Sequence, residues 1–213
     1  MGRGEAQYLQ QLRFVVVSAV DEHNQVHTSL LFGKPGFANA ASKDPLMKPG
    51  ESLVVLRGVR IPRGDAVRQC LLRQHTPVGL LAIDLVRRTR LRINTRVHLT
   101  TEAEDETVTV LLAVLETYGN CPKFIQQRAP MFASPASEPT PVRSSEGKVL
   151  SAAQRELIRG ADTFFLGTAH PDRGADASHR GGLPGFVRVD ETGDELWWPD
   201  YPGNGLFSRC RPL

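Results

Sequence analysis

Polar and apolar residues alternate along the middle of the chain, between residues 88 and 99. The polar positions carry four arginines and one asparagine: Arg88, Arg90, Arg92, Asn94 and Arg96. The positions between them include Leu91, Ile93 and Val97. Successive side chains of a strand point to opposite faces. The stretch therefore predicts a strand with one basic face and one apolar face.

The segments around this strand also favour β structure. The run PVGLLAIDL contains a continuous apolar stretch over residues 78–85, as expected of a strand that is buried on both faces. Residues 52–56 predict a short strand, and the β-branched residues of 107–115 predict another. Residues 65–74 predict one or two helical turns.

Two segments far apart in the chain resemble each other. Residues 14–37, FVVVSAVDEHNQVHTSLLFGKPGF, align without a gap with residues 163–186, TFFLGTAHPDRGADASHRGGLPGF. Ser29 then meets Ser178, Gly33 meets Gly182, and each segment ends in Pro-Gly-Phe. Each has an apolar run, a polar turn and a second extended run, which predicts a strand, a hairpin turn and a strand.

A short helix is expected before each hairpin. Residues 4–12 predict the first, and Ser151 with Gln154 three residues later forms a capping box at the start of the second. An internal duplication of a barrel-forming unit is the simplest interpretation. The alternative is a chance similarity between two hairpins.

The chain between the two copies contains a segment rich in proline and serine. Residues 129–148 contain four prolines and few large apolar residues, which is typical of a linker. The expected organisation is a first barrel-forming unit over residues 1–128, the linker over 129–148, and a second unit over 149–213.

The composition is that of a globular protein. Of the 213 residues, 40% are hydrophobic and 23% are charged, as in an ordinary globular protein. The absence of any apolar run of roughly 20 residues predicts no membrane association, and a cytoplasmic location is the default expectation. The three cysteines, Cys70, Cys121 and Cys210, are too widely spaced to indicate a disulfide framework or a metal site.

Candidate chemistry gathers in the second copy. Ser178 and Arg180 lie on the same side of an extended chain and could hold a phosphate. Gly181 and Gly182 allow a ligand or another backbone to approach closely. Taken singly, each has a structural interpretation: a strand serine, a solvated charge, the glycines of a bulge. Trp197 and Trp198 would point to opposite faces, which predicts that one of them is core.

Five stretches of the chain together resemble the pyridoxamine 5'-phosphate oxidase-like FMN-binding split-barrel family, in its tandem-barrel type. The stretch ADTFFLGTAHPDRGADASHRGGLPGFVRV and the following WWPDYPGN are similar to this family. So are PVGLLAIDL, RRTRLRIN and YGNCPKFIQQR, which come in the same order upstream. The resemblance implies a mainly β, α+β fold: an antiparallel split β-barrel with a partial second copy. It also implies FMN as cofactor, held between two barrels.

Residue by residue, the resemblance implies a cofactor-binding set. The positions beside the flavin would be Ser178, His179, Arg180, Gly182, Phe186, Asp200, Tyr201 and Asn204. Arg92 and Asn94 match the basic strand of the family, and Lys123 and Gln126 match its loop after the first barrel. No residue stands out as an obligatory acid or base, so the catalytic residues stay unknown. His179 and Tyr201 are the best candidates to guide a proton.

The resemblance ends at Phe207, where the family would continue through further strands. The expectation is therefore a second barrel cut roughly in half, whose open edge a homodimer would be one way to cover. The leading hypothesis is an FMN-dependent oxidoreductase with a small-molecule substrate or electron donor. The alternative is a non-catalytic split-barrel binding or assembly module. A nucleic-acid partner is disfavoured, because the arginines lack interleaved aromatic residues for base stacking.

Overall fold

A seven-stranded antiparallel sheet dominates the computed structural model, which describes residues 1–41, 52–129 and 147–201. The spatial order of its strands is β2-β1-β5-β6-β7-β4-β3. Their bounds are β1 (Phe14–Val20), β2 (Val26–Phe32), β3 (Ala38–Ala41), β4 (Leu53–Arg60), β5 (Pro77–Asp84), β6 (Thr89–Glu102) and β7 (Thr107–Gly119). The two ends of the sheet approach each other where β2 meets β4, so the sheet curls into a barrel.

Two short helices accompany this barrel. Helix α1 (Arg3–Gln11) packs beside β3, and α2 (Ala66–Leu72) packs against β1, β2 and β6. The start of α2 is fixed by Asp65, whose carboxylate accepts a hydrogen bond from the backbone N–H of Val67 at 2.9 Å.

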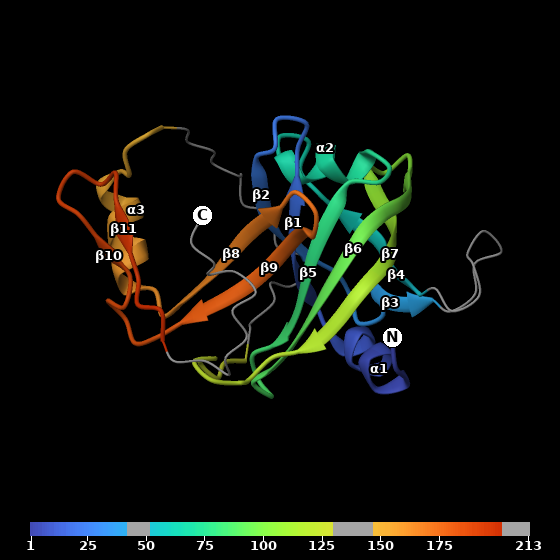
Figure 1. Cartoon of the computed structure of the whole chain (residues 1–213), viewed down its shortest axis with the longest axis horizontal. Helices are drawn as coiled ribbons and strands as arrows, with labels where there is room; N and C mark the ends of the chain where they lie inside the picture. Colours follow the sequence, from blue (N-terminus) through green and yellow to red (C-terminus); the bar gives the residue numbers. More distant parts are fainter. Residues whose placement is uncertain (42–51, 130–146, 202–213) are drawn as a thin grey trace.

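The second part of the chain places a hairpin on the outside of the barrel. Its elements are α3 (Ala152–Gly160), β8 (Thr163–His170), β9 (Gly174–Gly181), β10 (Arg188–Val189) and β11 (Leu196–Trp197). The β8–β9 hairpin lies across β1, β2, β5 and β6, while α3, β10 and β11 gather at the far side of the hairpin (Figure 1). In the three described segments no helix has the length and apolarity to cross a bilayer.

Two clusters of buried apolar side chains follow from this arrangement. The larger fills the barrel and includes Leu56, Leu80 and Ile93. The smaller lies between the barrel and the β8–β9 hairpin: Phe14, Val16, Leu81, Ile83, Ile125 and Ala177. Because β1 and β5 are covered on both faces, their sequences are continuous apolar runs rather than alternating ones.

The two copies noted in the sequence also correspond in structure. Shifting α1 by 149 residues gives the bounds of α3, and β1 and β2 shift onto β8 and β9 to within one residue. A Cβ on Gly33 would lie 2.3 Å from the Phe37 ring, and one on Gly182 would lie 2.6 Å from the Phe186 ring. These matched positions support the internal duplication, which stays a prediction.

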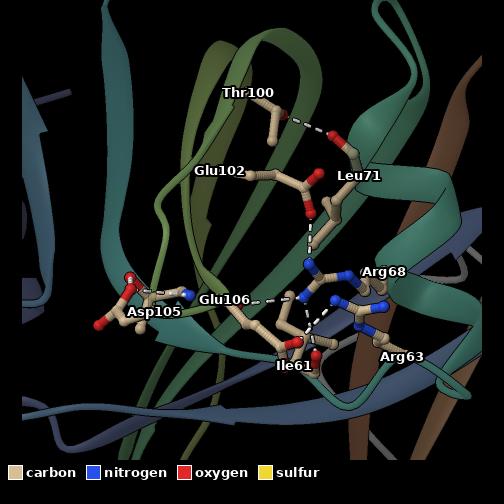
Figure 2. Close-up of polar contacts among 9 residues, drawn as sticks. Ile61, Arg63, Arg68, Leu71, Thr100, Glu102, Asp105 and Glu106 are labelled. Carbon is tan, nitrogen blue, oxygen red and sulfur yellow. Dashed lines mark hydrogen bonds and ion pairs between the residues drawn. The ribbon is translucent and has the colours of Figure 1, made fainter.

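A buried arginine ties α2 to the β6–β7 hairpin (Figure 2). The Nη1 atom of Arg68 donates to the carbonyl of Ile61 at 2.9 Å and to that of Glu106 at 3.4 Å. Its Nη2 atom donates to the Glu102 carboxylate. The Arg68 side chain is only 7% exposed. We refer to these contacts as the Arg68 network.

Most elements expected from the sequence are present. The predicted fold class, a split-barrel-like antiparallel β fold with short helices, is confirmed, and β4, β6 and β7 extend beyond their expected ends. The expectation that one of Trp197 and Trp198 is core was wrong: both are exposed, at 49% and 38%, because β11 pairs with β10 and not with the barrel sheet. Most of the expected linker lies outside the described residues.

Candidate functional site

The basic face of β6 is covered by β9. Strand β9 lies on the outer face of β5 and β6, where Gly79 leaves room for it. A Cβ on Gly79 would lie 2.4 Å from the Cα of Asp176, so only glycine permits this approach. The contact brings residues 176–180 against residues 90–94, which are more than 80 positions away in sequence.

Arg90 and His179 meet at the centre of this contact. The Nη1 atom of Arg90 lies 3.0 Å from Nδ1 of His179. Because a guanidinium only donates, Nδ1 must accept, and the neutral imidazole then carries its proton on Nε2. Arg90 also donates through Nη2 to the Cys121 carbonyl at 2.6 Å, which holds its guanidinium in place.

Two further arginines complete the group. The Nη1 atom of Arg92 lies 3.3 Å from Oδ2 of Asp176, in an ion pair that is almost buried. The Nη1 atom of Arg180 lies 3.5 Å from Oδ1 of the exposed Asp200. We call Arg90, Arg92, Arg180 and His179 the arginine cluster.

The pKa values of the arginine cluster reflect burial first and the crowding of positive charge second. Burial, and then the charges of Arg90 and Arg180, lower the pKa of His179 to about 4. Burial and the neighbouring Arg92 lower the pKa of Arg90 to about 10. At neutral pH His179 is therefore uncharged and the three guanidinium groups remain charged.

Several donors of the arginine cluster are buried without an acceptor. Within the described part of the chain, the Nε atoms of Arg90, Arg92 and Arg180 and the Nε2 atom of His179 have no hydrogen-bond partner. Each of these nitrogens carries a proton. A group that supplies several acceptor oxygens and negative charge would satisfy them together.

An aromatic stack lies beside the arginine cluster. The rings of Phe124 and Tyr201 are stacked with their centroids 4.5 Å apart. The backbone carbonyl of Phe124 is so close to Gly181 that a Cβ there would lie 2.1 Å from the oxygen. The stack is therefore held against the end of β9, directly after Arg180.

The structure separates the predicted site residues into groups. His179, Arg180 and Arg92 belong to the arginine cluster. Asn94 lies on the same face of β6 as Arg92, and its Oδ1 atom is buried without a partner among the described residues. Asp200 pairs with Arg180, and Tyr201 stacks on Phe124.

Other predicted residues have structural partners. Ser178 is fully buried on the face of β9 opposite to His179, and its hydroxyl donates to the Leu166 carbonyl at 3.2 Å. The carbonyl of Gly182 accepts from Nε2 of Gln126 at 2.9 Å. Phe186 stacks on Phe164 with the ring centroids 5.8 Å apart. Lys123 is exposed after β7, and Asn204 lies outside the described residues.

Sequence reasoning did not assign Arg90 or Asn120 to the site. The signal for Arg90 was its place on the basic face of β6, but alternation alone cannot show that a distant strand covers that face. Asn120, which directly follows β7, has a buried Oδ1 atom with no partner in the described segments. No pattern in the sequence distinguishes it from a loop asparagine.

Comparison with known proteins gives no family assignment. No protein-family model matches the chain. No curated protein matches it either.

The solved structures that are similar in part include the following three. One is a candidate pyridoxamine 5'-phosphate oxidase from Lactobacillus delbrueckii, with 14% identity, a TM-score of 0.37, and coverage of 55% of this chain and 93% of that one. A HupZ variant from Group A Streptococcus has 12% identity, a TM-score of 0.39, and coverage of 56% and 99%. An FMN-binding protein from Syntrophomonas wolfei has 9% identity, a TM-score of 0.36, and coverage of 55% and 84%.

Proposed function

We propose that this protein binds FMN and acts as an FMN-dependent oxidoreductase, with the phosphate of the flavin held by the arginine cluster. The observation that carries the proposal is the set of buried donors without acceptors on Arg90, Arg92, Arg180 and His179. A buried donor without an acceptor costs about 1–3 kcal/mol. The donors on Arg90, Arg92 and His179 lie where β9 covers β6, and the charge of Arg180 acts on both Arg90 and His179. Unsatisfied donors grouped in this way favour a ligand rather than a structural role.

A phosphate matches these donors in charge and in number of acceptors. It offers three oxygens and about two negative charges. The carboxylates of Asp176 and Asp200 already occupy the Nη1 atoms of Arg92 and Arg180, and the Nε atoms of both arginines remain. Charge-assisted hydrogen bonds from guanidinium groups to phosphate are among the strongest in proteins.

The surroundings also suit a flat ring system. The stacked Phe124 and Tyr201 offer aromatic surface directly beside the end of β9. Asn94 and Asn120 each have a buried amide oxygen without a partner among the described residues, which can accept a hydrogen bond from a ligand N–H group. When bound, the flavin would supply the redox chemistry, and this chain would hold and shield it. The residues present therefore fit the cofactor that the sequence resemblance implies.

The test compares FMN with riboflavin, which lacks the phosphate. The purified protein is incubated with each flavin, passed through gel filtration, and its absorption spectrum is recorded. We expect FMN to be retained in near-stoichiometric amount and riboflavin to be retained at least about tenfold less. Arg180→Gln should remove this preference, whereas Arg173→Gln, in the exposed turn before β9, should preserve it.

Two results would contradict the proposal. The first is a protein that is folded by circular dichroism and retains no flavin, which would leave the non-catalytic binding module as the better explanation. The second is equal retention of FMN and riboflavin, since the arginine cluster would then have no part in binding.

A further inference from the structure

An open groove of about 470 Å³ borders the arginine cluster on the side of the β5–β6 turn. Its described walls are Arg87, Arg88, Thr89, Arg90, Asn120 and Pro122. The turn supplies one wall, and the segment that follows β7 supplies the other. The backbone N–H of Asn120 donates to the Arg90 carbonyl at 3.4 Å, which fixes the two walls side by side.

The charge on this groove is only partly balanced. Arg87 lies 3.7 Å from the carboxylate of Asp84 and also donates to the side chain of Gln11. Arg88 is exposed at the tip of the turn. Asn120 also lines the groove, but its buried Oδ1 atom, which has no partner among the described residues, is an acceptor and so does not contribute to anion binding.

We propose that this groove is a second anion-binding site, which takes the phosphate or carboxylate group of a small molecule. The ligand would be the substrate or electron donor of the proposed flavin reaction, and this identification rests on the proposed function. Arg90 connects the two sites, because its guanidinium contacts His179 while the residue also lines the groove. A molecule held there would lie directly beside a group bound in the arginine cluster.

The dimensions of the groove favour a small molecule. Its volume falls within the range of about 300–1,000 Å³ that is typical of small-molecule pockets. The three arginines on its walls match the negative charge of a phosphate or carboxylate. The described walls contain no aromatic side chain on which a nucleic-acid base could stack.

The experiment separates the groove from the arginine cluster. Binding of inorganic phosphate and of succinate is measured by calorimetry in the Arg180→Gln background, where the arginine cluster is weakened. Adding Arg87→Gln and Arg88→Gln should lower phosphate affinity about tenfold or more, since two charge-assisted contacts are lost. The control adds Arg173→Gln and Arg188→Gln instead, which removes the same number of exposed charges. It should change phosphate affinity by less than about twofold.

The choice between the two anions identifies the ligand class. Tighter binding of phosphate than of succinate indicates a phosphorylated reaction partner, and the reverse indicates a carboxylic acid.

The proposal is overturned if the Arg87 and Arg88 substitutions change phosphate affinity no more than the matched pair does. It is also overturned if those substitutions instead abolish a steeply salt-dependent binding of duplex DNA. FMN retention should be the same in the Arg87→Gln, Arg88→Gln variant as in the wild type, so failure here is distinguishable from failure of the flavin proposal.

Discussion

The Arg68 network and the arginine cluster show two different uses of buried arginine in one chain. Arg68 donates to two backbone carbonyls and one carboxylate, and it leaves no buried nitrogen without a partner in the described residues. In the arginine cluster three guanidinium groups each leave a buried Nε atom without an acceptor. The first arrangement has its buried donors satisfied within the chain, and the second leaves buried donors that the proposed anion would satisfy.

This difference gives a way to distinguish arginines that stabilise the fold from arginines that bind a ligand. An arginine with all of its donors satisfied contributes to folding, because its removal leaves buried carbonyls unpaired. An arginine surrounded by other positive charges is repelled by them, and a bound anion would offset this repulsion. Substitution of Arg68 should therefore lower the free energy of unfolding. Substitution of Arg180 should instead lower ligand affinity and change the free energy of unfolding little.

Arg68→Met should destabilise the protein by about 3–4 kcal/mol, because the Ile61 and Glu106 carbonyls lose a charged donor. The measurement is urea unfolding followed by circular dichroism. Arg63→Met is the matched control: its side chain is 78% exposed and pairs with Glu106, so its loss should cost less than about 1 kcal/mol. A variant Arg68→Met as stable as the wild type would show that the Arg68 network is not structural.

Acid should weaken the arginine cluster by protonating His179. The folded-state pKa of His179 is about 4, below its ordinary value of 6.5. Its contribution is therefore complete above pH 6.5 and is lost as the pH falls toward 4, by about 3 kcal/mol at pH 4. Unfolding at a series of pH values should show a shallower loss in His179→Leu than in the wild type. The exposed His23→Gln should follow the wild-type curve, and identical curves for all three proteins would contradict the assignment.

Gly79→Ala should detach the β8–β9 hairpin, because the added Cβ would meet the backbone of Asp176. We expect a loss of about 2 kcal/mol and faster hydrogen exchange in β8 and β9. FMN binding should fall with it, since Arg92 and His179 would lose their partners across the contact. Gly119→Ala, where a Cβ meets nothing within 4 Å, is the control. Unchanged exchange in β9 would mean that the close contact is not required.

Arg180→Gln should leave the stability of the unliganded protein within about 0.5 kcal/mol of the wild type, because its ion pair with Asp200 is partly exposed and its charge opposes that of Arg90. The same urea experiment as for Arg68 measures this. A loss comparable to that of Arg68→Met would remove the distinction between the two arginine sites.

Much of the local structure followed from the sequence, whereas the site followed only in part. The alternation of residues 88–99 correctly placed Arg90, Arg92 and Asn94 on one face of β6. The pairing of Ser178 with Arg180 as phosphate ligands was drawn from their common face of β9. In the structure Ser178 bonds to the neighbouring strand β8, and His179, on the opposite face, meets Arg90.

The sequence by itself determined most strands of the barrel sheet, the starts of α2 and α3, and the presence of two similar strand-turn-strand segments. These features depend on alternation, capping and turn residues, which act over a few positions. Only the tertiary structure decided that β9 covers the basic face of β6, because that contact depends on Gly79 admitting the backbone of Asp176 from nearly 100 residues away. The arginine cluster forms because this contact brings residues of β9 against the basic face of β6 and partly buries their charged groups.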